Sequence, residues 1–187
     1  MRTWTRKGSL GGPKLRSEID GNEAAVLRSL VESVRGMLSD RAESTPQDPL
    51  AELTGIRTGH SKPPEEAALA RLLPDFHKPD KKDDGSDLNG ALRSLHEPEI
   101  IDAKCAAADV ILRTLPSGGG KIVLTLEQAD AWMSGLNDVR LALGTALDVH
   151  PEMPDELEPG DPRAPHLPVY HWLTWMQDSL IQALMGE

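Results

Sequence analysis

The chain has 187 residues and a mass of 20.3 kDa, which fits one domain with a substantial core, residues 1–187. No apolar run approaches the roughly 18 residues that cross a bilayer, which excludes a membrane-spanning protein. A single cysteine and the absence of an apolar signal segment indicate a cytoplasmic protein. The net charge of −10 disfavours nonspecific binding of nucleic acid by the domain as a whole.

The N-terminal sequence predicts a hairpin followed by a helix. Residues 2–6 and 14–19 alternate between polar and apolar side chains and flank a turn-rich stretch, as in a β-hairpin. Asp20 is followed three residues later by Glu23, a pattern typical of a capping box. Apolar residues then recur at helical spacing and predict a first helix over residues 21–41.

Residues 44–86 change in composition to Pro, Asp, Gly and Lys and are expected to be mostly irregular. Two short helices are expected inside this segment, at residues 49–54 and 64–73. The charged run at residues 79–86 contains no apolar side chain, so we expect it to be mobile.

The helical pattern resumes at residue 87. Pro98 suits the first turn of a helix, so we expect it to separate two helices, the second of which ends near Leu115 and is buried. A short strand over residues 121–124 follows, and Thr125 with Gln128 predicts another capping box.

The last part of the sequence predicts two more helices joined by a loop. The first of them ends near Val149, and the second begins near Val169 and runs almost to the C-terminus. Between them, residues 150–168 form an acidic, Pro-rich loop. The expected fold is mainly α (α+β): a bundle of four to five helices with a small sheet from the N-terminal hairpin and one short later strand.

The charge is unevenly distributed along the chain. The first 16 residues hold five bases and no acid, namely Arg2, Arg6, Lys7, Lys14 and Arg16, which we call the basic arm. The arm either packs against acidic surface of the same chain or contacts a partner, and direct DNA binding would be confined to it.

Cys105 is the one thiol and the redox candidate. It lies in an apolar stripe between Ile101 and Ala108, which also suits a small buried hydrophobic residue. Asp109, four residues later, would raise the pKa of the thiol rather than lower it.

His96, Glu97 and Glu99 form a candidate polar site at the expected helix start. Acids are common there because of the helix dipole, so the same residues also suit capping and solvation. An enzyme would need His96 and a neighbouring acid to converge in a concavity with perturbed pKa values. The sequence has neither a zinc-binding motif nor a complete phosphate loop, and no metal or cofactor is expected.

A candidate protein interface combines the basic arm with the last helix. Trp172 and Trp175 lie three residues apart, which suits either core packing or an aromatic contact with a partner. The candidate interface residues are Arg2, Trp4, Arg6, Lys7, Trp172 and Trp175.

Five runs resemble an actinobacterial domain-of-unknown-function family that includes an oxidative stress regulator, with similarity over nearly the full length. They are LTGIRTG at 53–59, ARLLPDF at 70–76, LRSLHEPEII at 92–101, LNDVRLALG at 136–144 and VYHWL at 169–173. The resemblance implies a single non-enzymatic regulatory domain in the cytoplasm that responds to oxidants. It also implies action through a protein partner, an alternative sigma factor of RNA polymerase.

Two alternatives to this function stay open at the level of sequence. One is an enzyme that uses His96, Glu97 and Glu99, and the other is an adaptor in ClpS-dependent proteolysis, which the family's genomic context implies. The family's redox mechanism uses a pair of cysteines, whereas this sequence has only Cys105. An internal disulfide switch is therefore excluded here, and the thiol could at most be oxidised or form a mixed or intermolecular disulfide.

Overall fold

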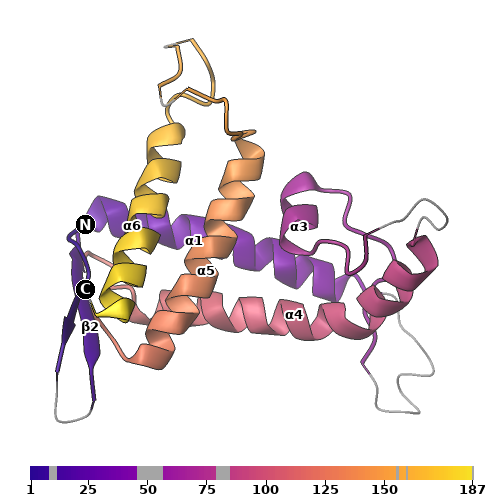
Figure 1. The fold of residues 1–187 in the computed structure, drawn as a ribbon, viewed down its shortest axis with the longest axis horizontal. Helices are drawn as coiled ribbons and strands as arrows, with labels where there is room; N and C mark the ends of the chain where they lie inside the picture. The colour runs from indigo at the N-terminus through magenta and orange to yellow at the C-terminus, as the bar shows by residue number, and fades with distance from the viewer. Residues whose placement is uncertain (9–11, 46–56, 79–84, 155, 159, 187) are drawn as a thin grey trace.

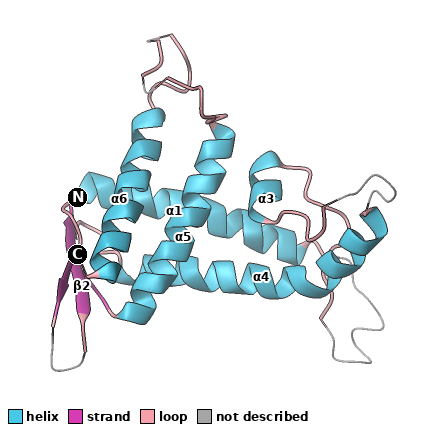
Figure 2. Ribbon diagram, viewed as in Figure 1, coloured by secondary structure: helices cyan, strands magenta, loops and turns pink. Residues whose placement is uncertain are grey.

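The computed structural model describes residues 1–8, 12–45, 57–78, 85–154, 156–158 and 160–186. In these ranges the elements are β1 (Thr5–Lys7), β2 (Lys14–Ile19), α1 (Gly21–Glu43), α3 (Ala67–Leu72), α4 (Ser86–Thr114), β3 (Gly120–Leu124), α5 (Leu126–Ala146) and α6 (Leu167–Met185). Figures 1 and 2 show α1 and α4 along the long axis, α5 and α6 rising from them, and the sheet at one end. The predicted mainly α fold with a small sheet is confirmed.

Two expectations about local structure lie outside the described residues. They are the helix over 49–54 and most of the charged run over 79–86. The second expected helix of that segment is present but shorter, as α3.

The sheet joins the predicted hairpin to the later strand. Its strands are antiparallel in the order β1-β2-β3, and Leu15 of β2 lies opposite Arg6 of β1 and Leu124 of β3. Leu15, Ile122 and Leu124 are fully buried, so one face of the sheet closes the core. The expected pairing of the hairpin with the distant strand is confirmed.

Both predicted capping boxes are present. The Asp20 carboxylate accepts a hydrogen bond from the Glu23 backbone N–H at the start of α1, and Thr125 does the same for Gln128 at the start of α5. In each box the side chain of Glu23 or Gln128 accepts a hydrogen bond from the backbone N–H of the cap residue three positions earlier. Each box therefore satisfies two backbone N–H groups at the start of its helix. These residues fix where α1 and α5 begin.

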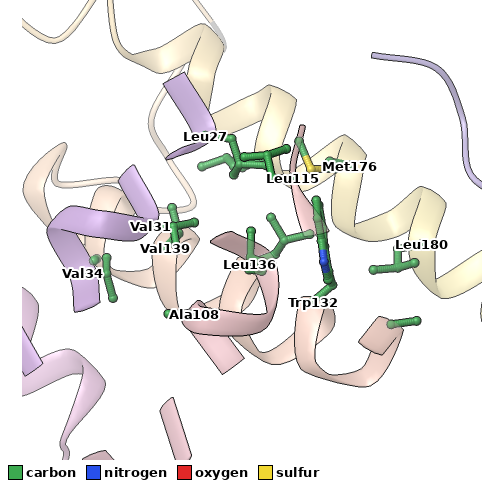
Figure 3. Close-up of a cluster of buried hydrophobic side chains, with 14 of the residues drawn as sticks. Leu27, Val31, Val34, Ala108, Leu115, Trp132, Leu136, Val139, Met176 and Leu180 are labelled. Atoms are coloured by element: carbon green, nitrogen blue, oxygen red, sulfur yellow. The ribbon is translucent and has the colours of Figure 1, made fainter. Parts of the chain in front are cut away.

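The core forms where α5 packs against α1 and α6 (Figure 3). Trp132 is fully buried at its centre, and its indole N–H donates to Thr114 Oγ1 at 2.8 Å. The aliphatic side chains around it come from four elements; they include Leu27, Val31, Ala108, Leu136, Val139, Met176 and Leu180. The core is aliphatic around a few rings, as the low aromatic content implies.

The predicted break at Pro98 is wrong, because α4 continues through it as one 29-residue helix. A proline inside a helix removes one backbone N–H and so leaves the carbonyl four residues earlier without its helical partner. Here that carbonyl, on Ser94, accepts a hydrogen bond from the Gly59 backbone N–H at 2.7 Å. The segment before α3 therefore supplies the missing donor, and the helix passes Pro98 without an unpaired carbonyl.

Gly59 is required at this contact because a Cβ at this position would lie 3.0 Å from the Pro98 ring. We expect Gly59→Ala to lower the free energy of unfolding by about 1–2 kcal/mol, since the loop would have to move away from α4. The matched control is Gly36→Ala in α1, where a Cβ meets nothing within 4 Å. That change should raise stability by about 0.5–1 kcal/mol. Urea unfolding of both variants checks the opposite signs.

Candidate redox, polar and protein-binding sites

Cys105 is half-buried on α4, on the side that faces α1. Its Sγ lies 3.9 Å from Ser39 Oγ, and Arg35 and Asp109 form an ion pair of 2.6 Å nearby. Burial raises the pKa of the Cys105 thiol, while the hydrogen bond between Cys105 and Ser39 and the charge of Arg35 oppose this rise only in part. The thiol is therefore protonated at neutral pH and is a weak nucleophile.

This environment predicts slow alkylation of Cys105. At neutral pH, iodoacetamide should modify the folded protein at least about threefold more slowly than the same chain in urea, because thiolate is the reactive form. The rate in the folded protein should still be rising above pH 9.0, the ordinary value from which its pKa is raised. Mass spectrometry measures the rate of modification. A rate that levels off well below pH 9.0 would show an activated thiol instead.

The residues of the candidate polar site are divided between the surface and the interior of the molecule. His96 is exposed, and its ring lies 6.0 Å from that of Phe76. Glu99 is also exposed, whereas Glu97 is only 1% exposed. Glu97 therefore lies inside the molecule, whereas His96 and Glu99, three residues apart on α4, share its exposed side.

Glu97 belongs instead to a buried ionic network. One of its carboxylate oxygens accepts from Arg93 Nη1 at 2.8 Å, and the other accepts from Arg41 Nε of α1 at 2.8 Å. Arg93 is itself buried and also donates to Asp75 Oδ1 at 2.8 Å and to the Leu73 carbonyl at 3.0 Å. The network connects α1, α4 and the segment that follows α3.

Asn89, two turns before Glu97, holds the same segment through its amide group. Its side-chain oxygen accepts from the backbone N–H groups of Phe76 and His77, and its Nδ2 donates to the His77 carbonyl. Sequence reasoning missed Asn89 and Arg93. Asn89, Arg93 and Glu97 are spaced by four residues, which places them on one face of a helix. This polar stripe is the feature of the sequence that could have predicted the network.

An open groove of about 910 Å³ lies between α4 and α5. Asp138 is buried in it and accepts from Lys104 Nζ at 2.6 Å; burial raises the pKa of Asp138, and Lys104 partly opposes that rise. Neither His96, Glu97 nor Glu99 lines this groove. This groove is therefore separate from the predicted polar residues, although Glu97 lines two smaller pockets.

Of the candidate interface residues, Trp4 is in the core rather than on the surface. It is 5% exposed, stacks edge-on against Trp132 with ring centroids 5.5 Å apart, and its backbone N–H donates to Ser179. Trp172 is half-buried, and Trp175 is 41% exposed. The expectation that Trp4 contributes to an interface is therefore wrong, whereas Trp175 is accessible.

The basic arm forms the first two strands and is partly fixed in place. Arg6 donates to the Leu184 carbonyl at 2.9 Å, where a cation is favoured near the C-terminal end of α6. Arg2 forms an exposed ion pair with Glu18, and Lys7 is exposed. The arm and α6 are therefore adjacent, as the candidate interface requires.

Neither a metal-binding cluster nor a membrane-spanning helix is found among the described residues. In that part of the chain no three His, Cys, Asp or Glu side chains cluster in a way that could hold a metal ion. None of the helices described is long and apolar enough to cross a membrane.

Comparison with known proteins identifies the family. The model of a family described as domain of unknown function DUF2017 matches residues 1–184. The chain belongs to the DUF2017 family. DUF2017 relatives named oxidative stress regulator AosR, from Mycobacterium tuberculosis and Mycobacterium bovis, are 47% identical to it over 195 residues. The alignment covers 100% of this chain and 89% of each relative, and no solved structure matches.

These relatives confirm the family resemblance inferred from the five sequence runs. A third DUF2017 relative, from Mycobacterium leprae, is 45% identical, also over the whole of this chain. The M. tuberculosis and M. bovis proteins are named as regulators and not as enzymes.

Proposed function

We propose that this DUF2017 protein regulates the response to oxidative stress by binding another protein. The observation that carries the proposal is the 47% identity to AosR over the full length of the chain. Relatedness at this level over every element supports a shared role, because no element of the fold falls outside the alignment.

The described surface suits a protein-binding role better than catalysis. The buried Glu97 is separated from the exposed His96 and Glu99, and the groove between α4 and α5 is lined by other residues. The outer side of α6 exposes Trp175, Ile181 and Met185, and exposed apolar groups of this kind are typical of contact surfaces.

An alternative sigma factor of RNA polymerase is the partner class that we propose, as the family resemblance implies. The test is titration of purified alternative sigma factors against the immobilised chain, before and after treatment with hydrogen peroxide. Saturable binding to one of them, lost when Trp175 is replaced by Glu, would support this partner class. Binding to none would refute it.

The proposed function itself is tested by complementation. A mycobacterial strain that lacks its own AosR should survive hydrogen peroxide better when it expresses this chain than when it carries an empty vector. Colony counts after exposure give the measurement. Equal survival with comparable protein levels would refute the proposal.

A further inference from the structure

The sheet has one buried face and one uncovered face. Along β2, Leu15, Ser17 and Ile19 are buried against the helices, and the residues between them are more exposed. Figure 1 shows the sheet at one end of the molecule with the helices to one side of it. The alternate residues of each strand therefore project away from the core.

The strand register places several bases on this uncovered face. Lys7 lies opposite Lys14, and Arg16 lies opposite Val123, while Lys121 is on the same side of β3 as Val123. We call Lys7, Lys14, Arg16 and Lys121, together with Val123, the basic sheet face. Its bases come from all three strands.

Among the described residues, Lys7, Lys14 and Arg16 have no acidic partner, whereas Lys121 lies directly across the sheet from Glu18. The one acid that projects beside them, Glu18, is paired with Arg2. Lys7 and Lys14 are directly opposite each other, an arrangement that destabilises a sheet. The chain as a whole has a net charge of −10, and the described contacts within it do not account for this local excess of positive charge.

We propose that the basic sheet face docks an acidic segment of a protein partner, an inference that rests on the proposed protein-binding function and specifies the partner's chemistry. Carboxylates on the partner would supply the missing counter-charges and relieve the repulsion between Lys7 and Lys14. Val123, which is 47% exposed among these bases, provides an apolar contact of the kind found inside charged rims.

A protein segment fits this face better than a nucleic acid does. The face carries no aromatic ring on which bases could stack. A nucleic acid would also extend past the four bases along a body whose net charge is strongly negative, whereas a short acidic segment can be confined to the sheet.

The test uses a fluorescent peptide of Glu, Asp and Leu residues, its Gln and Asn counterpart, and duplex DNA as probes of the full chain. Lys7→Glu/Arg16→Glu reverses two charges at positions where neither residue faces a carboxylate across the sheet. Lys62→Glu/Lys78→Glu makes the same change at exposed positions outside the sheet and is the matched control.

We expect the sheet variant to weaken binding of the acidic peptide about tenfold or more and the control variant to leave it unchanged. Amide shifts caused by the peptide should map to β1, β2 and β3, and binding should weaken with salt. Circular dichroism verifies that both variants are folded. Equal binding by both variants, shifts located elsewhere, or tighter binding of DNA than of the peptide would overturn the inference.

The same variants separate this inference from the proposed function. A sheet variant that no longer binds the peptide but protects the AosR-lacking strain as fully as the wild-type chain would overturn the inference and leave the function intact. Failure of the wild-type chain to protect the strain would overturn the function.

Discussion

Glu97→Ala is expected to lower the free energy of unfolding by about 3–5 kcal/mol. The change removes the carboxylate that accepts from Arg93 and Arg41, and Arg93 is 1% exposed. Arg93 keeps an ion pair with the more exposed Asp75, but Arg93 and Arg41 both lose their buried counter-charge, so the cost of their desolvation is no longer compensated in full. Urea unfolding followed by circular dichroism measures the loss.

Glu99→Ala is the matched control for this prediction. Glu99 is two residues away on the same helix but is exposed, so its replacement should change stability by no more than about 0.5 kcal/mol. Similar losses in the two variants would mean that Glu97 is not the centre of a buried network.

Trp132→Ala should also lower stability by about 3–5 kcal/mol. The side chain is fully buried between α1 and α6, stacks against Trp4 and satisfies its N–H on Thr114. Its removal leaves a cavity at the centre of the core. The expected consequence is a large fall in the urea midpoint.

The control here is a residue of the same type, Trp175, which is 41% exposed on α6. Trp175→Ala should change stability by less than about 1 kcal/mol because little packed surface is lost. A larger loss for Trp175 than for Trp132 would contradict the assignment of the core.

Where a signal is local, the sequence predicted the fold well. Asp20 with Glu23, and Thr125 with Gln128, mark helix starts because each capping box is complete within four residues. The alternation of residues 14–19 likewise determined which side chains of β2 face the core. In both cases the physical cause lies within one short window.

Where the cause lies in another part of the chain, local sequence analysis failed. Pro98 does not end α4 because Gly59, far away in sequence, donates to the carbonyl that the proline leaves without its helical partner. Glu97 belongs to a buried ionic network rather than to a polar surface site, because Arg41 of α1 forms an ion pair with it. Neither partner can be inferred from the residues around the site.

The candidate interface shows the same limit. Trp4 sits among basic residues at the N-terminus, yet its ring packs edge-on against Trp132 and its backbone N–H is held by Ser179 of α6. The basic sheet face was not predicted, because its four bases come together only once the register of all three strands is known.

The proposed role of this chain is to regulate the oxidative stress response through protein contacts, without an internal disulfide. Colony survival after hydrogen peroxide, in an AosR-lacking mycobacterial strain that expresses either the wild-type chain or Cys105→Ala, tests it most directly. We expect both chains to restore survival, because the half-buried Cys105 has a raised pKa and no second cysteine to pair with. No protection by the wild-type chain, or protection that Cys105→Ala abolishes, would contradict it.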